Sequence, residues 1–329
     1  MRWPAGAGST PWRLFAIQVL AVLFLLEGAH FLAARGIEPL SSWFYVVAWY
    51  SFIFLTDTCI HALKNESLLR TRPGEFLLML PWSVFIWLIF ELVNVRLANW
   101  HYINVTTGRC LRWAGYFVSF ATVLPGILLS AELMQSVGLF RTSRTRPFPR
   151  TSAWYPCFWV VGALCALLPL AWPRYFFPLI WGAFVFLLEP FNHRRGAPSL
   201  MTALERGDPR PVYLLLSAGA VCGGLWEFWN FWAKTKWVYS VPFFTDLKLF
   251  EMPLAGFLGF PPFALECYVM YNFVRWVVQR RQDGPESRGR NLVRIMAAAV
   301  VLAVTCVVGF SAIDAATVWT WAGCKTSRP

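Results

Sequence analysis

Charged residues are scarce in this chain of 329 residues. Only 14% of them are Asp, Glu, Lys or Arg, whereas a soluble domain carries about 25%. So few charges cannot cover a surface that faces water, which excludes an ordinary soluble domain. Hydrophobic residues make up 57% of the chain and aromatic residues 18%. Lipid is therefore the expected solvent for most of the chain.

Motifs for metals and for common catalysis are also missing. The eight Cys include no C-x-x-C pair, and none has zinc-finger spacing with one of the four His. We find no phosphate-binding glycine loop, no G-x-S-x-G elbow and no H-E-x-x-H motif. The sequence thus predicts no metal site, with a carboxylate–histidine site as a minor alternative, and it leaves any cofactor unassigned.

The net charge of +12 lies mainly between the apolar runs. Aromatic and basic residues do not interleave as they do on a nucleic-acid platform, so nucleic acid is not an expected partner. Most of the 29 Lys and Arg residues fall at the N-terminus and in alternate loops. The positive-inside rule then predicts an integral protein of a bacterial cytoplasmic membrane, with its N-terminus in the cytoplasm.

Long apolar runs predict an all-α fold, a polytopic transmembrane bundle of about nine helices. Each run approaches the ~20 residues that a membrane-spanning helix needs. Proline at 253 and at 261–262 is expected to break the eighth run. The predicted spans lie near 14–34, 42–61, 75–98, 114–135, 154–172, 174–190, 211–233, 250–274 and 293–320.

An internal repeat is suggested by polar residues that recur at matching places. FLTDTCIHALKNESL (54–68) matches FLLEPFNHRRGAPSL (186–200), and FELVNVRLANWHY (90–102) matches WEFWNFWAKTKWVY (226–239). An even number of helices in each unit would insert both copies the same way round, so we predict parallel repeats. The predicted units are a four-helix repeat at 1–140, a second at 151–281, and a C-terminal helix and tail at 292–329.

Acidic residues recur inside these spans, without Lys or Arg well inside a span. Glu91 and Asn94 lie three apart and share a helix face, as do Glu227 and Asn230. An ionised carboxylate in hydrocarbon is unfavourable, so we predict one catalytic pocket at the outer leaflet. Its two glutamates would handle protons and its two asparagines would orient them. The predicted substrate-binding residues are Glu27, His30, Trp100, Tyr102, Trp226, Trp237, Tyr239 and Glu266.

The same residues have a structural alternative. Glu–Asn pairs can join helices by hydrogen bonds, and Trp and Tyr can anchor a chain at the membrane interface.

A second polar layer is predicted at the inner side. Asp57 and His61 lie four apart, as do Glu189 and His193, so each pair shares a face. A carboxylate beside a histidine can orient the ring for metal binding or proton transfer. We favour the alternative, in which these are solvated helix ends whose carboxylates meet nearby arginines.

The order of Trp237, Tyr239, Pro253 and Glu266 is similar to an order found in integral membrane lycopene cyclase domains. The resemblance covers about 40 residues. The adjacent acidic pair that follows proline in those domains is absent here, and their repeat has fewer helices. We therefore assign no family on this basis.

Three functions remain open from the sequence. The leading hypothesis is an enzyme that modifies a lipid or isoprenoid by acid–base chemistry, with a membrane lipid or another apolar small molecule as its partner. A secondary transporter or proton-coupled carrier fits the repeats and acids equally well. A non-catalytic membrane assembly subunit is the third. The sequence does not indicate an oligomeric state.

Overall fold

Nine helical segments in the described part of the chain are long and apolar enough to cross a membrane. The computed structural model describes residues 9–243, 247–279 and 287–319. The nine segments agree with the predicted spans, so the chain is a polytopic integral membrane protein with a helical bundle. The spans are Arg13–Ala34, Leu40–Lys64, Pro73–Leu97, Arg109–Ser136, Thr151–Ala171, Pro173–Arg194, Arg210–Trp232, Leu254–Val278 and Leu292–Ala316.

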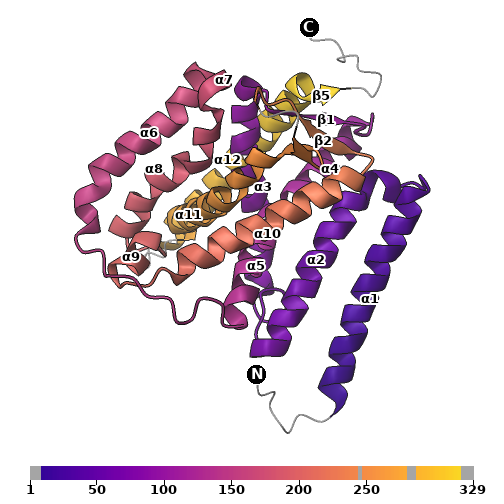
Figure 1. Ribbon diagram of the computed structural model, residues 1–329, viewed down its shortest axis with the longest axis horizontal. Coiled ribbons are helices and arrows are strands. Elements are labelled where there is room, and N and C mark those ends of the chain that lie inside the picture. The colour runs from indigo at the N-terminus through magenta and orange to yellow at the C-terminus, as the bar shows by residue number, and fades with distance from the viewer. Residues whose placement is uncertain (1–8, 244–246, 280–286, 320–329) are drawn as a thin grey trace.

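Eight long helices and several short ones build these spans (Figure 1). The long helices are α1 (Ser9–Ala34), α2 (Leu40–Lys64), α3 (Pro73–Leu97), α6 (Tyr155–Ala171), α8 (Ile180–Arg194), α10 (Arg210–Trp232), α11 (Phe260–Gln279) and α12 (Ser287–Ala316). The fourth span consists of α4 (Arg109–Phe120) and α5 (Val123–Ser136). The shorter elements are α7 (Pro173–Phe176), α9 (Leu200–Glu205) and the 3-10 turns η1 (Thr151–Trp154), η2 (Phe177–Leu179) and η3 (Leu254–Gly259).

Short strands join helices at one end of the bundle, which we call the sheet end. β1 (Trp100–Ile103) follows α3, β2 (Lys236–Tyr239) follows α10, and β5 (Val318–Trp319) follows α12. β1 lies between the other two, antiparallel to β2 and parallel to β5. A second pair, β3 (Lys248–Leu249) and β4 (Met252–Pro253), precedes η3.

The core lies where α11 packs against α10, α8 and α3. Close approach of α10 and α11 depends on glycine: a Cβ atom at Gly219 would lie 2.5 Å from the carbonyl oxygen of Phe260, and one at Gly223 would lie 2.2 Å from the Phe260 ring. By contrast, α1 packs mainly against α2 at the edge of the bundle (Figure 1).

The proline prediction for the eighth span is only partly right. Pro253 precedes η3, and the helix proper begins at Phe260. Pro261 and Pro262 therefore lie in the first turn of α11 and do not break it. Proline is tolerated there because the N–H groups of a first turn have no partner within the helix.

Candidate functional site

Two asparagine side chains fix the strands that follow α3 and α10. The Asn94 amide donates to the Trp100 carbonyl (2.8 Å) and accepts from the N–H groups of Asn99 (2.8 Å) and Trp100 (3.3 Å). Asn230 donates to the Trp237 carbonyl (2.9 Å) and accepts from the Trp237 N–H (3.0 Å). We expected both amides to orient glutamates. Both amides bind the backbone instead. An Asn side chain has an N–H donor and a C=O acceptor, so it can pair with a neighbouring backbone segment as a peptide group does.

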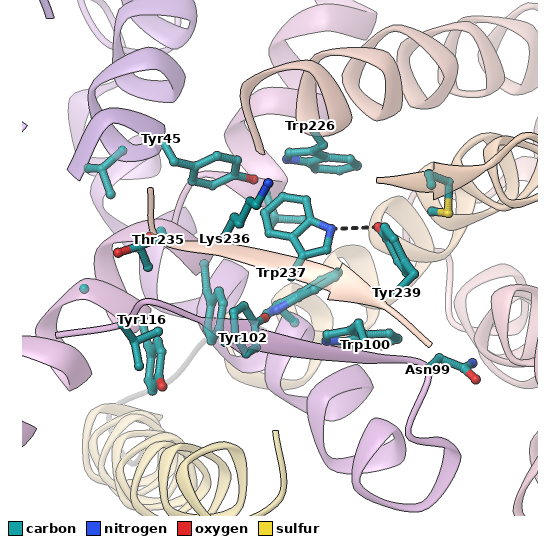
Figure 2. A pocket seen from close by; sticks show the side chains of 18 of the residues that line it. Tyr45, Asn99, Trp100, Tyr102, Tyr116, Trp226, Thr235, Lys236, Trp237 and Tyr239 are labelled. Carbon is teal, nitrogen blue, oxygen red and sulfur yellow. Dashed lines mark hydrogen bonds between the residues drawn. The ribbon is translucent and has the colours of Figure 1, made fainter. Parts of the chain in front are cut away.

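The strand register then gathers four aromatic side chains. Trp100 is paired with Tyr239 and Tyr102 with Trp237. Side chains alternate between the two faces of a strand, so residues two apart point the same way. All four line one cavity of about 190 Å³ at the sheet end, together with Trp226 of α10 (Figure 2). Five predicted substrate-binding residues thus lie in one cavity wall.

Glu91 lies behind this wall and is fully buried. Its Oε1 atom accepts from the Tyr102 hydroxyl (2.5 Å), the Trp87 indole N–H (2.8 Å) and the Trp100 indole N–H (3.2 Å). The Trp100 N–H also lies 3.3 Å from Oε2. Three donors converging on one carboxyl group favour its ionised form, which only accepts hydrogen bonds.

Glu227 is equally buried but has fewer partners. Its Oε1 atom accepts from the Tyr239 hydroxyl (2.7 Å), which in turn accepts from the Trp237 indole N–H (2.8 Å). Its Oε2 atom has no hydrogen-bond partner among the described residues. A buried carboxylate with one donor and a bare oxygen is costly, so this environment favours the protonated form of Glu227.

The two tyrosines connect the acids to the cavity. Tyr102 and Tyr239 line the cavity while their hydroxyls contact Glu91 and Glu227. Burial, followed by the nearby carboxyl group, raises the pKa of each phenol well above its usual value. Both tyrosines therefore keep their protons at neutral pH. The glutamates themselves are not among the cavity-lining residues.

Cationic side chains also reach the cavity, and each has an acidic partner. Arg112 binds Asp314 through two of its nitrogens (2.8 and 2.6 Å), and Lys236 binds Glu251 at 2.5 Å. The sequence had suggested acids without basic partners. Asp314 of α12 contradicts that expectation. The fourth span was expected to begin near 114, but α4 begins at Arg109, so Arg112 lies within the helix and pairs with Asp314. Glu132 also contradicts it, since Lys64 and Arg72 pair with it.

Three predicted pocket residues lie elsewhere. Glu27 and His30 are exposed on α1, and neither lines the cavity. The His30 ring lies against Phe44 and Trp232. Glu266 is fully buried in α11, where it accepts from the Phe184 N–H at 2.9 Å and does not line the cavity.

In the second predicted layer, the carboxylates bind turns rather than histidines. Asp57 accepts from the Ser67 hydroxyl and the Leu69 N–H, both at 2.9 Å. Glu189 accepts from the Ser199 hydroxyl at 2.6 Å and from the N–H of Met201 at 2.7 Å. Both carboxylates are 2% exposed, so they are not the solvated helix ends that we favoured, although Asp57 does meet Arg70 at 3.9 Å.

The two histidines of this layer differ from each other. His193 contacts the Tyr155 hydroxyl at 2.5 Å and Glu205 at 3.0 Å. The Nδ1 atom of His61 is buried and has no partner in the part of the chain that the structure describes.

Several functional candidates were missed by sequence reasoning. Trp87 lies four residues before Glu91 on the same helix face, and that spacing could have identified it as a donor. Arg112 and Lys236 gave no such signal, because their partners are distant in sequence or lie across a loop.

The described residues contain no group of three or more His, Cys, Asp or Glu that could hold a metal ion. Comparisons with protein-family models, with curated proteins and with solved structures found no match. The architecture alone therefore classifies the chain. It is a polytopic membrane protein in which the buried Glu91 and Glu227 contact two tyrosines of an aromatic cavity wall.

Proposed function

We propose that this protein is a membrane enzyme that binds an uncharged lipid or isoprenoid in the sheet-end cavity and rearranges it by proton transfer. One observation carries the proposal: two cavity-lining tyrosines each donate a hydrogen bond to a different buried glutamate. An apolar pocket with a few convergent polar groups and buried acids is the arrangement expected of such a site.

The cavity wall favours an uncharged ligand. Its cations, Arg112 and Lys236, are each neutralised by an acid at hydrogen-bond distance. The Arg112 guanidinium also donates to the carbonyls of Thr106 and Thr107, both at 3.0 Å. An anionic headgroup could bind Arg112 or Lys236 only by displacing its acidic partner. The displaced carboxylate would then lack a counter-ion within the cavity wall, which is unfavourable.

The two Tyr–Glu pairs divide the acid and base roles. Glu227, favoured in its protonated form, acts as the acid: the Tyr239 hydroxyl turns from Glu227 toward the substrate, gives its own proton to a substrate carbon and takes the proton of Glu227, which becomes a carboxylate. Glu91, whose three donors stabilise a carboxylate better than the single donor of Glu227 does, receives a proton from another substrate carbon through Tyr102. The substrate gains one proton and loses one, which balances an isomerisation or cyclisation of a polyene. A proton returned from Glu91 to Glu227 restores the starting state.

Matching contacts support a duplication of two four-helix units, at 1–140 and 151–281. Asp57 and Glu189 both bind a serine hydroxyl ten residues later and a backbone N–H twelve residues later. Asn94 and Asn230 both hold the strand that follows their helix. The predicted excess of basic residues at the opposite end favours a cytoplasmic location for that end, with the cavity in the outer half of the membrane.

The test compares lipid and pigment profiles of cells that produce the wild-type chain, the Glu227→Gln variant or the Glu91→Gln variant. The wild type should yield a lipid or pigment that cells without the gene lack. Either substitution should lower its amount at least about 100-fold, the scale of one general acid or base, with the protein still present in the membrane. Glu38→Gln, in an exposed ion pair with Lys234, serves as the control.

Unchanged profiles in cells with and without the gene would contradict the proposal. If uptake or efflux of a solute then followed the proton gradient, the chain would be a transporter. If both glutamine variants changed only the association of helices, an assembly role would replace the enzyme.

A further inference from the structure

Aromatic rings dominate the wall of the sheet-end cavity. Fourteen of its thirty lining residues are Trp, Tyr or Phe, whereas aromatic residues make up 18% of the chain. Trp100, Tyr102 and Trp226 are at most 7% exposed, so anchoring at the membrane interface does not account for them. Aliphatic side chains would hold an apolar ligand equally well. The excess of rings therefore indicates a ligand that aromatic side chains bind better than aliphatic ones do.

The polar edges of three indole rings in this wall already have partners within the protein. Trp87 and Trp100 donate their N–H groups to Glu91 at 2.8 and 3.2 Å, and Trp237 donates to the Tyr239 hydroxyl at 2.8 Å. These rings therefore offer a ligand their carbon surfaces. The face of an aromatic ring carries partial negative charge, and an N–H group bound to a carboxylate makes its ring richer in electrons.

The formal charges around the cavity do not oppose a cation. Arg112 and Lys236 each lie within hydrogen-bond distance of an acid, so the field of each is largely cancelled by its partner. Glu91 adds a carboxyl group directly behind two of the rings. Trp226 and Trp237 lie on either side of the same space (Figure 2). Electron-rich rings with an acid behind them attract positive charge.

We propose that this aromatic wall stabilises positive charge; in the reaction proposed above, on which this inference rests, the charge is that of a carbocation. When a proton adds to one carbon of a double bond, the π electron pair forms the new C–H bond and the neighbouring carbon becomes positively charged. Loss of a proton from a carbon next to the final cationic carbon restores a double bond, and Glu91 receives that proton through Tyr102. Between these two steps, ring faces within about 6 Å of the cationic carbon lower its energy.

A matched pair of water-soluble probes separates charge from shape. Choline and neohexyl alcohol have the same shape, but carbon replaces the quaternary nitrogen of choline in the alcohol. A cavity that is only apolar should prefer the alcohol, because a cation loses more on leaving water. The proposed wall should bind choline about tenfold more tightly, since an enzyme binds a charged intermediate more tightly than its neutral substrate. Equilibrium dialysis of radiolabelled choline against the purified full-length chain in maltoside detergent, with the alcohol as competitor, gives both dissociation constants.

Four variants connect the preference to the wall. Trp226→Leu removes a lining ring and should abolish the preference for choline, whereas Trp226→Phe keeps a ring face and should retain part of it. Glu91→Gln keeps the shape of the side chain but removes its charge, so choline should bind at least about threefold more weakly and the alcohol equally well. Trp232→Leu lies on the same helix but is 55% exposed and outside the cavity, so it should bind both probes as the wild type does.

The inference is overturned if the wild type binds the alcohol as tightly as choline or more tightly, or if Trp226→Leu and Glu91→Gln both keep the full preference. Should Trp226→Leu fail to fold, Trp226→Phe and Glu91→Gln decide. The lipid profiles keep this result apart from the enzymatic proposal. No preference for choline, with profiles that still depend on the gene, would leave the enzyme and remove the carbocation wall. A clear preference with unchanged profiles would remove the enzyme and leave a wall that binds cations.

Discussion

Replacing Asp314 with leucine is expected to lower the free energy of unfolding by about 3 to 4 kcal/mol, the lower part of the range for breaking one side of a buried ion pair, because the two side chains are 16% and 19% exposed. Asp314 of α12 accepts from Arg112, from the Trp113 indole N–H at 2.9 Å and from the Tyr116 hydroxyl at 3.1 Å. Its loss leaves a guanidinium unpaired within the wall of the sheet-end cavity. Unfolding in mixed detergent micelles measures the change.

A double variant and an exposed pair provide the controls. Arg112→Met combined with Asp314→Leu removes both charges and should recover most of the lost stability, since apolar residues often replace a buried ion pair without loss. Glu38 and Lys234 lie at 2.5 Å but are about half exposed. Glu38→Leu should therefore change stability by at most about 1 kcal/mol. Equal losses from Asp314→Leu and Glu38→Leu would contradict this account of the Arg112–Asp314 pair.

Asn94→Leu should be the next most damaging change, with a loss of about 3 kcal/mol. Three backbone groups lose their partner, each at about 1 kcal/mol or more, and all belong to Asn99 or Trp100. The same unfolding measurement applies. Trp100 and Tyr102 should also leave the wall of the cavity, which the fluorescence of the tryptophans would report.

A graded series separates this role of Asn94 from simple loss of volume. Asn94→Leu and Asn230→Leu make the same change of side chain but remove three and two hydrogen bonds, so the loss for Asn230→Leu should be about two thirds of the loss for Asn94→Leu. Asn94→Asp retains the acceptor but places a carboxylate against the Trp100 carbonyl in a fully buried site, so it should be at least as unstable as Asn94→Leu. An Asn230→Leu variant more unstable than Asn94→Leu would show that the hydrogen bonds do not set the stability.

The spans were predictable because hydrophobic length alone defines them. An apolar run of about 20 residues has one low-energy arrangement in lipid, a helix with all its backbone groups paired. The orientation of α1 about its axis was not predictable, because Glu27 and His30 interrupt a helix that is apolar on every side. Spacing of three residues puts the two side chains on one face, but only packing against α2 decides which face that is.

For the candidate site, the sequence identified the chemistry but not the partners. The buried Glu91 and Glu227, and the aromatic residues near them, stood out as polar or amphipathic groups in apolar sequence; their catalytic roles stay predictions. The antiparallel register of β1 and β2 was not readable, since four-residue strands after helices resemble interface loops. Tyr102 could not be matched to Glu91, nor Asn94 to the backbone of Asn99 and Trp100, without knowing that a strand turns back directly after α3. The pairing of Arg112 with Asp314 joins residues in different spans, which no local pattern encodes.

The central claim is that the sheet-end cavity holds an apolar molecule, and filling the cavity tests it most directly. Gly115 lines the cavity, and a Cβ atom there would meet only Trp43, at 4.0 Å. Gly224 does not line it, and a Cβ atom there would meet nothing within 4 Å. Mass spectrometry of lipids that co-purify with the chain compares Gly115→Phe with Gly224→Phe.

We expect wild-type protein and Gly224→Phe to retain the same uncharged lipid or isoprenoid, and Gly115→Phe to lose it. Retention of that molecule by Gly115→Phe, in an amount equal to the wild type, would show that it binds elsewhere and would contradict the assignment of the cavity.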